Sequence, residues 1–152
     1  MSNFAASRKV NPEGSSVKLT AEQVWKGLQI KARDPAKFIP DTTSVNTISD
    51  AEDKLIREIS FKGKPAVTQE ISFHPNVGTN CSHKDKNTSV SNILSYDESN
   101  ELVLTIQFVG GVPNQDPAPE ASTPENLNKR VGQSVERTIS QIRALVQDGT
   151  IA

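Results

Sequence analysis

The chain has 152 residues, of which 34% are hydrophobic and 23% charged, with a formal net charge of −1 and a sequence pI near 6.1. Lys and Arg are scattered, and aromatic residues make up only 5% of the chain, so the sequence offers neither an electrostatic footprint nor stacking platforms for nucleic acid. No run approaches the roughly 18 apolar residues of a membrane span, and no apolar stretch follows the N-terminal Met-Ser-Asn. We therefore expect a soluble, cytoplasmic protein that binds neither membranes nor nucleic acid.

Length predicts a single domain over residues 1–152, because a chain of this size buries roughly two thirds of its unfolded surface in one core. The only cysteine, Cys81, cannot form a disulfide within one chain and fits a reducing compartment. The oligomeric state stays open between monomer and homodimer.

The first third of the chain predicts a strand followed by helix. Residues 3–10 form a short strand that ends at the turn residues 11–14. In residues 19–32, Thr20 is placed to cap a helix together with Gln23. The apolar residues of this helix share one face, on which the single tryptophan is a core residue: Ala21, Val24, Trp25, Leu28 and Ala32.

Asp34-Pro35 ends that helix, and residues 36–39 allow at most one more helical turn. After Pro40 the apolar period changes from about 3.6 to 2, which predicts six antiparallel strands up to Val109. Residues 42–48 are the weakest of these strands by propensity, and residues 102–109 the strongest. Turn residues separate the strands at 50–53, 63–65, 75–76, 85–87 and 97–100.

Residues 123–148 predict one long amphipathic helix, roughly 38 Å in length at ~1.5 Å per residue. Ser122 or Thr123 provides the N-cap, Pro124 fits the first helical position, and Gly149 ends the helix. We expect a strongly bent antiparallel sheet to grip this helix and cover its stripe. The stripe consists of Leu127, Val131, Val135, Ile139, Ile142, Leu145 and Val146.

The proline-rich segment 110–123 connects the last strand to this helix. It is either a solvated connector or a lid, since loops longer than about 12 residues are often binding loops.

Polar side chains keep the phase of the core residues in the strands, so they should point to the core face. Arg57 has the phase of Leu55, Ile59 and Phe61; Gln69 that of Val67, Ile71 and Phe73; and Asn92 that of Val90, Leu94 and Tyr96. One face of the strand between them carries Val77, Thr79, Cys81 and His83, and the last strand has an unbroken apolar row of Leu102, Leu104, Ile106 and Phe108. The inward stripe of the long helix also includes Ser134 and Thr138.

In a dry core, each unpaired polar group would cost on the order of 1–3 kcal/mol, and a charge would cost more. These residues therefore face a cavity or pair with one another. Alternatively, Arg57 reaches water at a sheet edge and the amides cap bulges. We predict an internal pocket that is mostly apolar with a few convergent polar groups, which is typical of small-molecule sites.

Two other arrangements are weaker. Cys81 and His83, with His74 nearby, are metal-ligand residue types, but no fourth ligand or CxxC partner accompanies them, so we expect no metal. A Cys81 nucleophile with His83 as its base has suitable chemistry, yet alternate residues of one strand lie ~6.5–7 Å apart.

Three segments resemble the AtaL-like branch of the START/polyketide-cyclase-like (SRPBCC, helix-grip) superfamily: LTAEQVWKGLQIKARDPAKFIP, KLIREISFKGKPAVTQEISF and SVERTISQIRALVQDG. The resemblance implies an α+β helix-grip fold, in which two short helices follow the first strand and a seven-stranded antiparallel sheet wraps around the long C-terminal helix, with an apolar cavity between them. It also implies an association with secondary-metabolite pathways, but it transfers no catalytic residue.

We expect a small-molecule pocket protein, either a cofactor-independent cyclase, isomerase or dehydratase for an apolar polyketide, alkaloid or terpenoid intermediate, or a non-catalytic carrier. A protein–protein module that uses the same groove is a third possibility. Arg57 would stabilise developing negative charge on a carbonyl oxygen, and His83 would act as general acid or base. The ligand-binding candidates are Gln69, Cys81, Asn92, Phe61, Phe73, Phe108, Ser134 and Thr138.

Overall fold

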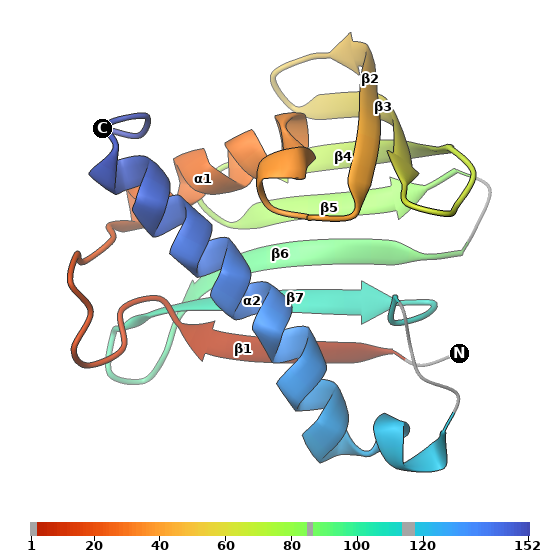
Figure 1. Ribbon diagram of the computed structural model, residues 1–152. Helices are drawn as coiled ribbons and strands as arrows, with labels where there is room; N and C mark the ends of the chain where they lie inside the picture. Colours follow the sequence, from red (N-terminus) through yellow and green to blue (C-terminus); the bar gives the residue numbers. More distant parts are fainter. Residues whose placement is uncertain (1–2, 85–86, 114–117) are drawn as a thin grey trace.

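The computed structural model describes residues 3–84, 87–113 and 118–152. Its seven strands form one antiparallel sheet in the order β1-β7-β6-β5-β4-β3-β2 (Figure 1). The first strand pairs with the last, so it adds an edge to a meander whose other strands follow chain order. The strands are β1 (Phe4–Lys9), β2 (Thr42–Asp50), β3 (Lys54–Phe61), β4 (Val67–His74), β5 (Gly78–His83), β6 (Ser89–Tyr96) and β7 (Leu102–Val109).

The helices begin and end close to the predicted residues. They are α1 (Ala21–Arg33), the short 3-10 turn η1 (Pro35–Lys37), a second 3-10 turn η2 (Pro119–Ser122) and the long α2 (Pro124–Gln147). The predicted cap of α1 is confirmed, because Thr20 Oγ1 accepts from the Gln23 backbone N–H and Gln23 Oε1 accepts from the Thr20 N–H. The helix-grip α+β architecture is therefore confirmed, with a single turn, η1, as the second of the two short helices.

Both long helices lie on the same face of the sheet. α2 crosses β1 and β7, whereas α1 lies over β5 and β6 and also touches α2 (Figure 1). The two helices approach closely at Gly27, where a Cβ would overlap the Ile142 side chain of α2. Trp25 is a core residue as predicted, with its ring edge on Phe73 at a centroid distance of 6.4 Å. No helix in the described parts of the chain is apolar over a bilayer's width.

The edge strand β2 is irregular and mostly exposed. Its pairing with β3 shifts register between Thr42 and Ser44 and again between Thr47 and Ser49. Such bulges bend a strand and increase its twist, so they help to curl this edge of the sheet. The weak propensity of residues 42–48 thus corresponds to an irregular edge strand that extends to Asp50.

Two residues that the alternation predicted among the inward-facing ones are exposed. Val77 precedes β5 and lies in the turn after β4, where its N–H donates to His74 O, and it is 53% exposed. Tyr96, the last residue of β6, lies beyond the covered part of the sheet and is 62% exposed. The predicted turn at 85–87 and the predicted lid at 110–123 both include residues outside the described ranges, so the lid stays a prediction.

Candidate functional site

A row of polar residues crosses three neighbouring strands on the inner face. Arg57 of β3 pairs with Gln69 of β4, which pairs in turn with His83 of β5. The side chains of Arg57 and Gln69 are buried, at 5% and 4% exposure. The interpretation that Arg57 reaches water at a sheet edge is therefore wrong, because its side chain is buried and its guanidinium contacts the last turn of α1.

The Arg57 guanidinium joins the sheet to the end of α1. Its Nε and Nη2 donate to Gln69 Oε1 at 2.9 and 2.8 Å, and its Nη1 donates to the Ala32 carbonyl at 2.5 Å. The last carbonyls of a helix lack partners within the helix and carry partial negative charge, so a cation there is favourable. Burial lowers the pKa of Arg57, although an Arg side chain stays protonated in proteins.

Gln69 connects Arg57 to His83 through a second hydrogen bond. The Gln69 Nε2 lies 2.9 Å from His83 Nε2. Since Gln69 Oε1 accepts from Arg57, the amide N–H is the donor and His83 Nε2 is the acceptor. A neutral His83 in this network therefore carries its proton on Nδ1.

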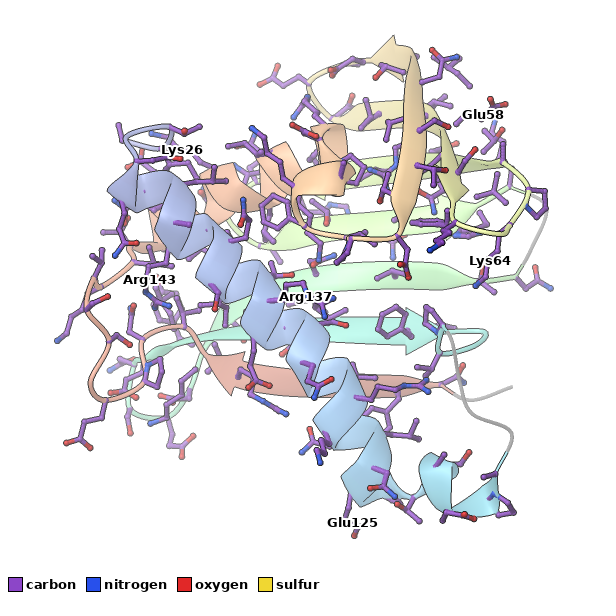
Figure 2. The ribbon with its side chains drawn as sticks, in the orientation of Figure 1. Lys26, Glu58, Lys64, Glu125, Arg137 and Arg143 are labelled. Atoms are coloured by element: carbon purple, nitrogen blue, oxygen red, sulfur yellow. The ribbon has the colours of Figure 1, made fainter. Side chains whose placement is uncertain are left out.

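A second polar group, centred on Lys31, joins both helices to β6. Lys31 Nζ donates to Asn92 Oδ1 at 2.9 Å and to Thr138 Oγ1 at 3.0 Å. The Thr138 hydroxyl donates to the Ser134 carbonyl at 2.9 Å. Burial and, to a smaller extent, repulsion by Arg57 and Arg137 together lower the pKa of Lys31 to about 7. Figure 2 shows Arg137 at the middle of α2.

The predicted pairing of inward polar residues is therefore present, but with a residue that the sequence analysis missed. Lys31 is the partner of Asn92 and Thr138, and it was not among the candidate site residues. A signal for it exists, because Lys31 lies four and seven residues after Gly27 and Val24, and both are buried. The test for polar residues in phase with the core, applied to the first helix, would have found it.

Cys81 lies on β5 between these groups, and its side chain is half-buried. Burial raises the pKa of its thiol, an effect that Arg57 and Lys31 partly oppose. A thiol with a raised pKa is a poor nucleophile at neutral pH, which argues against Cys81 as a nucleophile and leaves it as a candidate for ligand contact. Within the described residues, no group of three or more His, Cys, Asp or Glu side chains could hold a metal ion.

Apolar residues on the same face are only half-buried, although they have the phase of the core. The register joins Cys81, Val90 and Phe108 in one row across β5, β6 and β7, and all three are half-buried. His83 and Phe61 are half-buried as well. Solvent therefore reaches this part of the inner face, which we call the open inner face and define by Phe61, Cys81, His83, Val90 and Phe108.

The remaining predicted residues divide between the open inner face and the core. Ser134, half-buried on α2, accepts the Thr138 hydrogen bond through its carbonyl. Phe73 is 4% exposed, lies against Trp25 and has the Arg33 guanidinium 4.7 Å from its ring centroid. The predicted ligand contact of Phe73 stays a prediction, and its observed role is in the apolar core.

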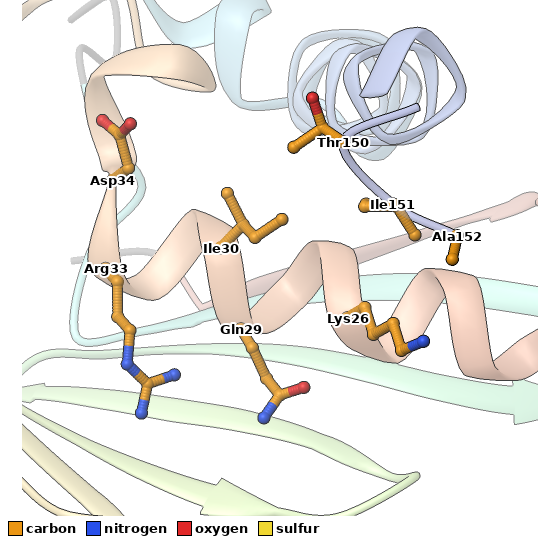
Figure 3. A pocket seen from close by; sticks show the side chains of 8 residues that line it. All are labelled: Lys26, Gln29, Ile30, Arg33, Asp34, Thr150, Ile151 and Ala152. Atoms are coloured by element: carbon orange, nitrogen blue, oxygen red, sulfur yellow. The ribbon is translucent and has the colours of Figure 1, made fainter. Parts of the chain in front are cut away.

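Two hollows in the surface contain none of the predicted site residues. One, of about 490 Å³, lies between α1 and the C-terminal residues and is lined by Lys26, Ile30 and Ile151 among others (Figure 3). The second, of about 410 Å³, lies between the start of the chain and Glu101. The predicted internal pocket is neither of these, so the candidate site is the open inner face together with the polar residues beside it.

Comparisons with known proteins agree with this architecture. Among solved structures, the di-domain ARO/CYC StfQ from the steffimycin biosynthetic pathway is similar with a TM-score of 0.62 and 10% identity, over 96% of this chain and 51% of StfQ, so the chain spans about half of that protein. The Zhui aromatase/cyclase from a Streptomyces species is similar with a TM-score of 0.55 and 16% identity over 95% of each chain. Ara h 8.0201 is similar with a TM-score of 0.54 and 12% identity, over 97% of this chain and 99% of that one.

At these identities the likeness shows a common fold and no more. A search of curated proteins found no match. The model of the family described as "Acetylaranotin biosynthesis cluster protein L" matches residues 4–149, almost the whole chain. The chain therefore belongs to the AtaL family, within the helix-grip superfamily that its sheet and long helix define.

Proposed function

We propose that the protein binds a small, largely apolar intermediate of secondary metabolism on the open inner face and promotes its cyclisation, isomerisation or dehydration without a cofactor. The observation that carries this proposal is the meeting of half-exposed apolar side chains with a buried, hydrogen-bonded cation. Phe108 and Val90 supply apolar surface, and Arg57 on β3 lies one strand from Gln69 and two strands from Cys81. Mostly apolar surfaces with a few fixed polar groups are typical of small-molecule sites.

In this proposal, Arg57 and His83 of the polar row have separate roles. Arg57 stabilises negative charge that develops on a substrate carbonyl oxygen, and its bonds to Gln69 and Ala32 fix its position before the substrate arrives. His83 donates its Nδ1 proton as a general acid. A cyclisation or dehydration of a polyketone needs both kinds of assistance, at a carbonyl oxygen and at a leaving oxygen.

A carrier without chemistry is the second candidate, and one observation favours it. The N–H groups of Arg57 that appear in hydrogen bonds are used within the fold, on Gln69 and on the end of α1. An Arg57 that serves only to hold α1 on the sheet would leave a binding surface with no catalytic group.

Mass spectrometry of small molecules that co-purify with the protein should identify the ligand class, and turnover of that ligand then separates the two candidates. For an enzyme, Arg57→Lys, which keeps the charge but not the planar fork, should lower turnover at least about tenfold while binding persists. His83→Gln should lower turnover as well. Binding with no turnover in the wild-type protein would contradict the enzyme and leave the carrier.

A further inference from the structure

The ammonium group of Lys31 has only neutral or positively charged surroundings. Its two hydrogen-bond acceptors, Asn92 Oδ1 and Thr138 Oγ1, are neutral and belong to buried residues. The charged groups that act on it are Arg57 from β3 and Arg137 from α2, together with the Cys81 thiol from β5. Across the parts of the chain that the structure describes, no Asp or Glu is among these groups.

Arg57 shows the same imbalance. Its hydrogen bonds reach the neutral oxygens of Gln69 and Ala32 and the Cys81 side chain, and the Cys81 thiol is again the titratable group that acts on it. Buried charges in proteins are ordinarily paired with an opposite charge, because desolvation is otherwise uncompensated. Two cations that repel each other beside an apolar surface are therefore costly in the free protein, and an anion between them would remove much of that cost.

We propose that Lys31 and Arg57 together bind a negatively charged oxygen group, such as a carboxylate or an enolate, on an otherwise apolar ligand. This inference rests on the proposed function, and it names the ligand class as an acidic, apolar metabolite. An ammonium group has three N–H donors, and two of those on Lys31 are used on Asn92 and Thr138, so one remains for a ligand. Charge-assisted hydrogen bonds are roughly twice as strong as neutral ones, which favours an acid over an ester or alcohol.

Access and orientation fit this assignment. The Lys31 side chain is half-buried, so a ligand that arrives from solvent can reach it. Asn92 and Thr138 hold the ammonium group between β6 and α2, next to the Cys81–Val90–Phe108 row. The apolar body of the ligand would cover that row while its acidic end contacts Lys31.

A matched pair of fluorescent probes tests the inference. Anilinonaphthalene sulfonate and phenylnaphthylamine have the same aromatic body and differ in the charged group. In titrations of the full chain, Lys31→Met should weaken binding of the sulfonate about tenfold or more and change binding of the neutral probe less than about twofold. Lys26→Met is the control, because Lys26 lies on the same helix, is paired with Glu22 and faces the hollow outside the sheet.

The sulfonate should also bind more weakly as the solution goes from about pH 6 to about pH 9, because Lys31 loses its proton over that range. The other groups that face Lys31 change little there, since Arg57 and Arg137 stay charged and burial raises the pKa of Cys81. His83, which touches Gln69, is a further titratable group of the row. Any pH dependence of sulfonate binding that persists in the Lys31→Met variant is therefore assigned to His83.

Each outcome of these titrations supports or overturns the inference. Equal effects of Lys31→Met on both probes, or no effect on either, would overturn the inference and leave the proposed function intact, since apolar binding would persist. If neither probe binds the wild-type protein, the proposed function fails together with the inference. Lys31→Gln, which keeps a polar side chain, must show the same selective loss; circular dichroism spectra confirm that each variant is folded.

Discussion

The inner face of the sheet has two parts that are built differently. Where α1 and α2 meet over the sheet, side chains such as Leu28, Ile142 and Leu104 form one contiguous apolar cluster with almost no exposure. On β3, Arg57 of the polar row follows Leu55, which belongs to this cluster. Ile59, the next inward residue after Arg57, is fully buried but lies outside the cluster.

The difference teaches that burial alone does not define a core. In the apolar part, close packing fixes the positions of the side chains, whereas in the polar part hydrogen bonds between separate elements fix them. Arg57 joins β3 to α1, and Lys31 joins α1 to β6 and α2. The apolar part supplies most of the stability, and the polar part keeps cations whose desolvation costs free energy in the free protein.

The largest effect should come from the apolar part. Ile142→Ala removes a fully buried side chain that contacts α1 at Gly27, and it should lower the free energy of unfolding by about 2–5 kcal/mol in urea titrations. As a control, Ile48→Ala on the exposed edge strand β2 should cost less than about 0.5 kcal/mol. Similar losses in the two variants would contradict the division of the molecule into these parts.

A smaller effect should follow from a break in the polar row. Arg57→Met leaves the Gln69 amide and the Ala32 carbonyl without their donor and should lower the free energy of unfolding by about 1–3 kcal/mol. The double variant Arg57→Met, Gln69→Leu should recover part of that loss, because both members of the buried pair become apolar. Losses that simply add would show that the pair is not coupled.

A substitution at the N-cap of α1 should affect both parts, because they share this helix. α1 carries both Trp25 of the apolar part and Lys31 of the polar part, and Thr20 caps its first turn. Thr20→Ala should lower the free energy of unfolding by about 1 kcal/mol, and Thr20→Ser should restore most of it. Thermal unfolding followed by circular dichroism measures both; an unchanged midpoint in Thr20→Ala would contradict the importance of the cap.

The smallest effect at any one pH should come from Lys31. Its folded pKa of about 7 lies below the usual lysine value of 10.5, so between these values the unfolded chain binds more protons and the free energy of unfolding rises with pH. The slope cannot exceed about 1.4 kcal/mol per pH unit, which is the limit for one proton, and it should be smaller because the side chain is partly exposed. Lys31→Met should remove this rise, measured as the difference in urea midpoints from wild type across that range; an identical pH profile would contradict a desolvated Lys31.

Much of the fold was predictable because its signals are local. Thr20 with Gln23, Pro124 and Gly149 mark helix ends through contacts within a few residues, and the change of period after Pro40 separates strands from helices. The inward phase of Arg57, Gln69 and Asn92 follows from the alternation of side chains along a strand, and their burial confirms it.

The partners of those side chains were decided by the tertiary structure. Arg57 can donate to Ala32, and Lys31 to Asn92, only because of where α1 lies over β5 and β6. That position depends on the bend of the whole sheet and on the close approach of Ile142 to Gly27. Periodicity tells which way a side chain points and carries no information on what another element places opposite it. The sequence alone therefore determined that Arg57, Gln69 and Asn92 turn inward, and the packing of helix on sheet brought Lys31 to them with no Asp or Glu among its partners in the described parts of the chain.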